Sequence, residues 1–228
     1  MEKPIKGVIF DLDGLLLGTE TIATTTTQKM LDLHCSTKQK FLMSTKLKML
    51  GKTMRDAVAI VLETHPVNLG LEEYLEEFNQ RLYEVFPTCS EMPGAIRLVR
   101  HLHEAGIPIA VATGSSSKAL FTKVEHREWF KTCFGDKWVS GDHVQKSKPD
   151  PEGFLIAASK IGIKPENCLV FEDSPSGVQA AINGGMKVIQ VNDIQQIIEN
   201  SPKSDSLLNS LEEFVPEKWG LPPYETNK

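Results

Sequence analysis

The amino-acid sequence predicts a doubly wound, Rossmann-like α/β fold: a parallel sheet core that carries an inserted α-helical domain. Two observations predict the sheet, because short apolar segments recur along the chain and end in polar residues, and helical patterns lie between them. A third observation predicts the insertion, since one long segment has helical periodicity without a buried-strand pattern. Strands that alternate with helices pair in parallel through right-handed crossovers, so we expect helices on both faces of the sheet.

Short apolar segments predict the strands of this sheet. The first segment runs directly into Asp11, the second into Thr113 and a later one into Glu172. Because the carboxyl ends of parallel strands meet at one edge of a sheet, we expect these polar residues to lie close together there. The predicted strands are Ile5–Phe10, Ile107–Ala112, Trp138–Ser140, Cys168–Phe171 and Lys187–Val191.

Helical patterns with clear stop signals lie between these strands. Ala95–Glu104 is followed by Gly106, and Pro151–Lys160 is followed by Gly162. The last segment, 206–228, contains several prolines and aromatic residues. We expect it to be an irregular tail that its aromatic side chains pack onto the surface.

The stretch from about residue 20 to residue 87 interrupts the alternation of strands and helices. It has helical periodicity at Thr21–Leu33, Met54–Glu63 and Leu71–Val85, and it lacks a convincing buried strand. We therefore expect an α/β core domain made of residues 1–19 and 88–228, and a helical domain made of residues 20–87.

The composition is that of a globular protein and excludes several classes of partner. The 228 residues are 40% hydrophobic and 24% charged, with a formal net charge of -5 and no clustered basic segment, which disfavours nucleic acid as a partner. No segment approaches the roughly 20 apolar residues of a membrane span, so we expect no membrane partner. The four cysteines form no C-x-x-C pair and no signal peptide is evident, which favours reduced thiols and a cytoplasmic location. We expect a monomer.

The pair Asp11 and Asp13 is the first candidate for chemistry. The two carboxylates are two residues apart, so in an extended chain they leave on the same side, close enough to share a cation and a substrate phosphate. Gly14 then allows a tight turn. The alternative is an ordinary turn at the end of a strand, because Asp and Gly are common turn formers.

Two further motifs carry charge at the ends of predicted strands. Lys148 lies in an extended loop restrained by Pro149, although a solvated surface lysine is the alternative. Glu172 and Asp173 are adjacent carboxylates that repel each other and need a compensating cation. A hard cation such as Mg²⁺, which prefers oxygen ligands, fits that need.

Taken together and in this order, the motifs resemble those of the haloacid dehalogenase superfamily of phosphatases. They are Asp11-Leu12-Asp13-Gly14, Thr113, Lys148-Pro149-Asp150-Pro151 and Glu172-Asp173-Ser174. The resemblance covers nearly the whole chain. It implies that the helical insertion is the small cap domain that closes over the active site in members acting on small phosphorylated metabolites.

The resemblance also implies catalytic roles. Asp11 would be the nucleophile that forms an aspartyl phosphate, and Asp13 would be the general acid and base. Thr113 and the amide of Gly114 would bind the transferring phosphoryl oxygens, while Lys148 would neutralise charge on both Asp11 and the phosphate.

The cofactor that the resemblance implies is Mg²⁺. Its ligands would be Asp11, the backbone carbonyl of Asp13 and Asp173, with Glu172 as a supporting or water-mediated contact. The ion would screen the repulsion between the anionic nucleophile and the anionic phosphate.

The linker to the cap departs from the relatives at one position, and the cap offers three candidate substrate contacts. Gly18 stands where relatives usually have Asp, and we expect altered hinge stiffness there before lost chemistry. In capped relatives the region of Gly51 and Lys52 faces the active site, so these residues and Arg55 are candidates for touching the distal part of the substrate. The alternative is that these charges are solvated on a helix face.

We therefore expect a Mg²⁺-dependent phosphomonoesterase acting on a small phosphorylated metabolite through an aspartyl phosphate. Segments outside the catalytic motifs, such as Glu84–Thr88 and Leu208–Leu211, are similar to the pseudouridine 5′-phosphatase group and imply a modified nucleoside 5′-monophosphate as substrate. A sugar or glycerol phosphate is the alternative. A phosphoglucomutase-like phosphoryl shuttle is disfavoured because no His precedes His34, and a non-catalytic binding module is a further alternative.

Overall fold

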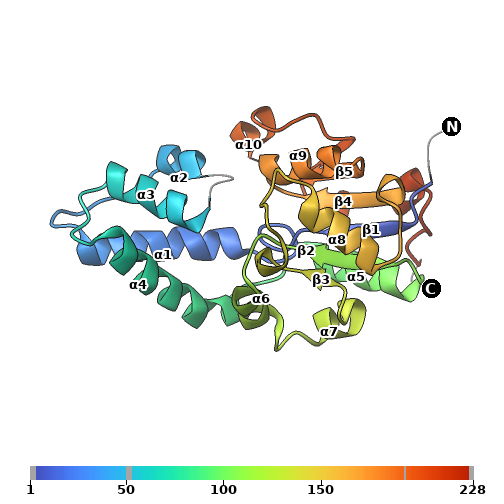
Figure 1. Ribbon diagram of the computed structural model, residues 1–228, viewed down its shortest axis with the longest axis horizontal. Coiled ribbons are helices and arrows are strands. Elements are labelled where there is room, and N and C mark those ends of the chain that lie inside the picture. Colours follow the sequence, from blue (N-terminus) through green and yellow to red (C-terminus); the bar gives the residue numbers. More distant parts are fainter. Residues whose placement is uncertain (1–3, 50–52, 193, 226–228) are drawn as a thin grey trace. The chain divides into compact units, whose positions relative to one another are not determined.

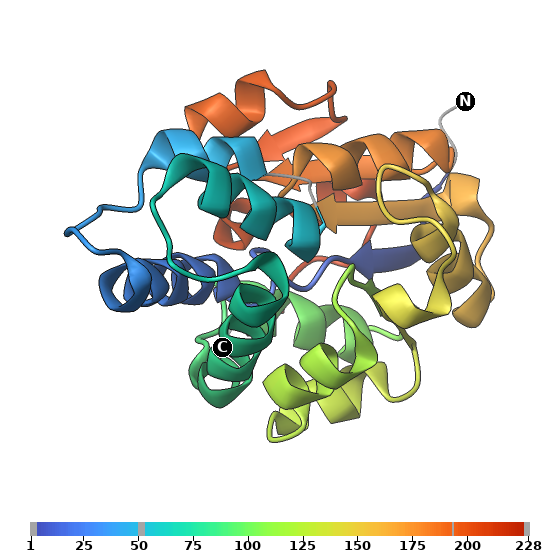
Figure 2. The same ribbon diagram turned by 60° about the vertical axis from the view of Figure 1, so that its left-hand side comes forward.

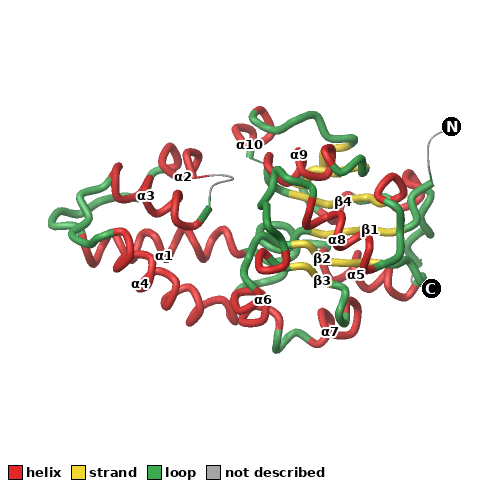
Figure 3. The backbone as a smooth tube through the Cα atoms, in the orientation of Figure 1, coloured by secondary structure: helices red, strands yellow, loops and turns green. Residues whose placement is uncertain are grey.

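The computed structural model describes residues 4–49, 53–192 and 194–225. The chain divides into two compact units, one formed by Met1–Leu17 with Ser90–Lys228 and the other by Gly18–Cys89. The first unit holds a parallel sheet and its surrounding helices, and the second is helical (Figures 1 and 3).

The sheet confirms the predicted doubly wound α/β fold. Its strands lie in the order β3-β2-β1-β4-β5-β6, and every pair of neighbours is parallel. At the centre, Val8 of β1 pairs with Ile109 on one side and with Leu169 on the other. The strands are β1 (Gly7–Phe10), β2 (Ile109–Ala112), β3 (Trp138–Val139), β4 (Cys168–Glu172), β5 (Lys187–Val191) and β6 (Ser206–Leu208).

Helices pack against both faces of the sheet. Figure 2 shows the green and orange helices beside the strands. On one face α8 contacts the strands from β1 to β3 and α9 contacts β4 and β5, while α5 and α7 contact β2. The helices of this unit are α5 (Ala95–Glu104), α6 (Ser117–Val124), α7 (Glu128–Phe134), α8 (Glu152–Lys160), α9 (Pro175–Asn183) and α10 (Gln195–Glu199).

Alternate residues of the central strands pack into two different apolar layers. Ile9 and Val170 belong to the layer with α8 and α9, whereas Phe10 stacks on Phe171 with 5.2 Å between ring centroids. Phe10 also meets Phe134 of α7 edge-on at 6.1 Å. Burial on both faces explains why these strands are apolar throughout, and each buried large side chain contributes about 1.5–3 kcal/mol to stability.

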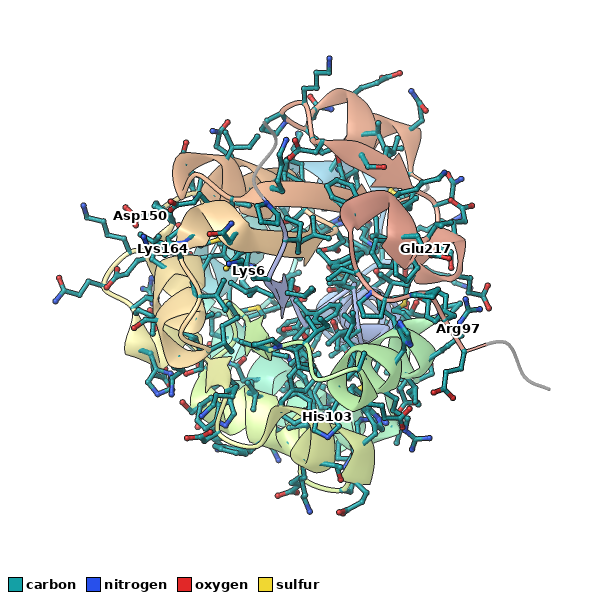
Figure 4. All side chains as sticks on the ribbon, turned by 90° about the vertical axis from the view of Figure 1, so that its right-hand side faces the viewer. Lys6, Arg97, His103, Asp150, Lys164 and Glu217 are labelled. Carbon is teal, nitrogen blue, oxygen red and sulfur yellow. The ribbon has the colours of Figure 1, made fainter. Side chains whose placement is uncertain are left out.

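The C-terminal segment differs from the irregular tail that the sequence predicts. Ser206–Leu208 forms the edge strand β6, in parallel register with β5. Only three residues pair, so the segment is too short to show strand periodicity, and its pairing depends on the neighbouring strand. Tyr224 lies beyond β6 in the chain, and the Arg97 guanidinium of α5 lies 3.9 Å from the centroid of its ring. This contact holds the C-terminal segment against α5. Figure 4 shows Arg97 on the same side of this unit as Glu217.

The described residues of the helical unit form four α-helices. α1 packs against α4, and α3 packs against both α2 and α4. Among its described residues the β-structure is limited to one isolated bridge between Cys35 and Val67, as the absence of strands in Figure 3 indicates. The helix α2 has no counterpart in the sequence prediction. The helices are α1 (Thr19–His34), α2 (Met43–Met49), α3 (Met54–Thr64) and α4 (Leu71–Val85). No described helix in either unit is both long and apolar enough to cross a membrane.

His65, which directly follows α3, is a buried histidine whose ring lacks hydrogen-bond partners among the described residues. Its backbone N–H donates to the Val61 carbonyl at 2.9 Å, but neither ring nitrogen has a hydrogen-bond partner among the described residues. The side chain is 6% exposed, and this burial lowers the pKa of His65 from its ordinary value of 6.5. The ring is therefore neutral in the folded protein.

We expect replacement of His65 by Phe to protect the protein against acid. In the unfolded chain His65 binds a proton below about pH 6.5, whereas in the folded chain it resists protonation, so the stability of the wild type falls as the pH drops through 6.5. The difference in thermal midpoint between His65→Phe and wild type should grow between pH 7 and pH 5. The exposed His103 provides the control, since His103→Gln should show no such growth. A constant difference across this range would contradict the prediction.

Candidate active site

Three neighbouring strands bring acidic and hydroxyl side chains to one edge of the sheet. Asp11 follows β1, Thr113 follows β2, and Glu172 ends β4, and these strands are adjacent in the order β2-β1-β4. The three residues are 6%, 5% and 1% exposed, respectively. The parallel register therefore places their side chains at the same buried end of the sheet, as the sequence predicts for α/β proteins.

Lys148 joins two of these carboxylates. Its ammonium nitrogen lies 2.5 Å from Asp11 Oδ1 and 2.6 Å from Glu172 Oε1. It also donates to the carbonyl oxygen of Ala112 at 3.3 Å, so all three donors of the ammonium group have acceptors. The structure thus favours a site lysine over the solvated surface lysine that was the alternative.

Glu172 uses both of its carboxylate oxygens on groups of the protein. While Oε1 accepts from Lys148, Oε2 accepts from the backbone N–H of Ser174 at 2.7 Å and from its hydroxyl at 3.0 Å. Gly177, in the first turns of α9, leaves room for this carboxylate, because a Cβ at that position would lie 1.7 Å from Oε1. The glycine is required here for space and not for backbone conformation.

The carboxylates Asp11, Glu172 and Asp173 have the chemistry of a Mg²⁺ site. Each offers an oxygen, and these three oxygens lie within 4.8 Å of one another. Burial, together with the negative charges of Glu172 and Asp13, raises the pKa of Asp11 to about 7 in spite of Lys148. A hard cation bound by oxygen ligands would offset this repulsion, so the residues fit the group. Because both oxygens of Glu172 are already engaged, Asp11 and Asp173 are the better candidate ligands.

Asp13 has partners of its own. Its Oδ2 accepts from the hydroxyls of Thr113 at 2.9 Å and Ser115 at 2.8 Å, and its Oδ1 accepts from Lys123 at 2.5 Å. Burial of Asp13 opposes ionisation, but the charge of Lys123 and the hydrogen bonds from Lys123, Ser115 and Thr113 lower its pKa overall. Asp13 is therefore a carboxylate in this structure.

Lys123 is the site residue that sequence reasoning missed. It lies on α6, is 1% exposed, and belongs to the same helix face as the buried Ala119, Leu120 and Val124. A lysine on an apolar helix face is the one signal that could have indicated it, since lysine is rarely buried without a partner.

For the other residues expected at the site, the structure gives less information about their roles. Gly114 is exposed immediately after Thr113, while Gly51 and Lys52 lie outside the described residues. Arg55 is exposed and pairs with Glu72, with one of its two hydrogen bonds at 3.1 Å. The pair with Glu72 lies on an exposed helix face, and contact of Arg55 with the substrate stays a prediction.

The matching family is described as a hydrolase, and two similar proteins are named as phosphatases. Residues 8–191 match the family described as haloacid dehalogenase-like hydrolase. The chain is 42% identical to "(DL)-glycerol-3-phosphatase 2" of Arabidopsis thaliana, with 97% of this chain and 93% of that protein covered. It is 36% identical to a Drosophila melanogaster protein named "Probable pseudouridine-5′-phosphatase", with 95% of this chain and 94% of that protein covered.

A solved structure shares the fold. The crystal structure of a HAD family hydrolase from Deinococcus radiodurans R1, determined with bound phosphate and sodium, has a TM-score of 0.77. The match covers 96% of this chain and 99% of that chain at 24% sequence identity.

The contact between Gly177 and Glu172 leads to a prediction about activity. We expect Gly177→Ala to displace the Glu172 carboxylate from Lys148, because the new methyl group would occupy its position. Phosphatase activity on p-nitrophenyl phosphate should fall by about 10- to 100-fold, since small misplacements of a site cost rates of that order. Gly153, in α8, is the matched control, because a Cβ there would meet Val144 at an ordinary 3.7 Å. Wild-type activity in Gly177→Ala would contradict the prediction.

Proposed function

We propose that this protein hydrolyses phosphomonoesters with Mg²⁺ through an aspartyl phosphate on Asp11. The premise is that the chain belongs to the haloacid dehalogenase-like hydrolase family and is a phosphatase acting on a small phosphorylated metabolite. The observation that carries this proposal is the 2.5 Å contact between Lys148 and Asp11, at the end of β1 and among further carboxylates. This contact holds the Asp11 carboxylate in place and lowers its pKa, although burial and the neighbouring carboxylates still raise that pKa to about 7.

In the first step, a carboxylate oxygen of Asp11 attacks phosphorus while the bond from phosphorus to the leaving oxygen breaks. The electron pair of the broken bond goes to the leaving oxygen, which receives a proton from the Asp13 carboxyl group. Asp13 is ionised before substrate binds, and the negative charge of an approaching phosphate raises its pKa and favours uptake of this proton.

In the second step, the Asp13 carboxylate takes a proton from a water molecule whose oxygen attacks phosphorus. The bond from phosphorus to Asp11 breaks, its electron pair returns to the Asp11 carboxylate, and inorganic phosphate leaves. Lys148 and the residues Thr113 and Gly114 are proposed to neutralise and bind the phosphoryl oxygens during both steps.

Bound Mg²⁺ supplies positive charge that screens the repulsion between the Asp11 carboxylate and the phosphate. Asp11, the Asp13 carbonyl and Asp173 are its proposed ligands. The position of Glu172 between Lys148 and Ser174 supports an indirect contact with the ion.

For the substrate, the comparisons favour glycerol 3-phosphate as the first candidate. The relative named for this activity is 42% identical over nearly the whole chain. A modified nucleoside 5′-monophosphate, pseudouridine 5′-phosphate, is the second candidate, because another relative carries that name at 36% identity. The role of residues 20–87 as a cap that reads the substrate beyond its phosphate remains part of this proposal.

The reaction class is tested with Asp11→Asn. We expect this variant to lose p-nitrophenyl phosphate hydrolysis by about 10³-fold or more, because the nucleophile is removed. Wild-type activity should also disappear with EDTA and return with added Mg²⁺. The exposed Asp136 offers a matched control, since Asp136→Asn should keep full activity. Release of phosphate that is insensitive to both EDTA and Asp11→Asn would refute the proposal.

The substrate is tested by a comparison of kcat/KM values. We expect glycerol 3-phosphate to exceed hexose phosphates by about 10-fold or more, a discrimination that a fitted site achieves through a few contacts. Pseudouridine and uridine 5′-monophosphates belong in the same panel. If pseudouridine 5′-phosphate exceeds both uridine 5′-monophosphate and glycerol 3-phosphate, the second candidate replaces the first.

A further inference from the structure

Lys123 lies within the sheet unit and contacts the carboxylate to which the proposed function assigns proton transfer. Its ammonium nitrogen is 2.5 Å from Asp13 Oδ1 and 2.8 Å from the Ser115 hydroxyl. The side chain is 1% exposed, so the ammonium group is a buried charge whose cost must be offset by these partners.

The contacts form a closed ring around the Asp13 carboxylate. Ser115 accepts a hydrogen bond from Lys123 and donates its own hydroxyl hydrogen to Asp13 Oδ2 at 2.8 Å. Lys123 binds the other oxygen, Oδ1, directly. Because Lys123 binds one oxygen and Ser115 binds the other, both the position and the plane of the Asp13 carboxylate are fixed.

The backbone that carries Lys123 is itself supported by a buried arginine. Arg127 Nε donates to the Lys123 carbonyl at 2.9 Å, and Arg127 Nη1 lies 2.5 Å from Glu91 Oε1. The Trp129 indole N–H donates to the same Glu91 oxygen at 3.1 Å. The end of α6 is therefore anchored, and Lys123 extends from a rigid base toward Asp13.

Lys148 and Lys123 bind different carboxylates of the site. Lys148 bonds Asp11 and Glu172, whereas Lys123 bonds Asp13. We propose that Lys123 is a positioning residue for Asp13: it holds the carboxylate in the orientation from which the proton is transferred. This inference rests on the proposed function, in which Asp13 is the general acid and base.

The test uses two substrates that differ in their need for a proton. An alkyl phosphate such as glycerol 3-phosphate has a leaving oxygen that must be protonated, whereas 2,4-dinitrophenyl phosphate releases a stable phenolate without a proton. We expect Lys123→Met to lower kcat on the best alkyl phosphate of the substrate panel by about 10- to 100-fold, with KM within about twofold of wild type. The rate of the first turnover with 2,4-dinitrophenyl phosphate should change by less than about threefold, because it needs no general acid.

Three variants connect the effect to Asp13. Lys123→Arg keeps a charged donor and should recover part of the lost kcat. Asp13→Asn should show the same dependence on the leaving group, and the double variant Asp13→Asn/Lys123→Met should be no slower than Asp13→Asn alone, since residues that act through one group are not additive. Lys131→Met, at an exposed position of α7, is the matched control and should behave as wild type.

The outcomes separate this inference from the proposed function. If Asp13→Asn slows both substrates equally, the role of Asp13 in the proposed function fails. If Asp13→Asn depends on the leaving group and Lys123→Met slows both substrates equally or neither, only the role of Lys123 is overturned. If Lys123→Met does not fold, Ser115→Ala decides, because it opens the ring and should give a smaller loss with the same dependence on the leaving group.

Discussion

The interaction on which the site depends is the pairing of carboxylates with lysines at the carboxyl edge of the sheet. Asp11 and Glu172 end neighbouring strands and share Lys148. Burial by itself lowers the pKa of this lysine, but the charges of the two carboxylates and their hydrogen bonds raise it overall, so the ammonium group stays charged. Without it, two neighbouring buried carboxylates would lack a compensating charge, which would favour protonation of one of them.

At this edge of the sheet, the pKa values of two carboxyl groups are shifted in opposite directions. The pKa of Asp11 is raised by burial and by its acidic neighbours, whereas that of Asp13 is lowered by Lys123 and by hydroxyl donors. Carboxylates with divergent environments are a common basis for a division of chemical roles. Here the acidic cluster around Asp11 fits a cation, and the hydrogen-bonded carboxylate of Asp13 fits its proposed role in proton transfer.

The relatives of this chain are named for more than one substrate. Proteins named for glycerol 3-phosphate and for pseudouridine 5′-phosphate are 42% and 36% identical to this chain over nearly its whole length. Relatives that match nearly the whole chain therefore carry names for different substrates. In the proposed function the residues at the strand ends carry the phosphate chemistry, so substrate choice is assigned to other groups.

Local sequence patterns were sufficient to predict helices and strands that are long enough to show their own hydrophobic periodicity. The helix Ala95–Glu104 and the strand Lys187–Val191 have the bounds that the sequence predicts, and the acidic residues follow apolar strands in the expected order. The tertiary structure alone decided the edge strand β6, which is too short to carry a pattern, and the pairing of Lys123 with Asp13 across 110 residues of sequence. Such a pairing leaves no local trace, because periodicity reports which face of a helix is buried and not which distant charge that face will meet.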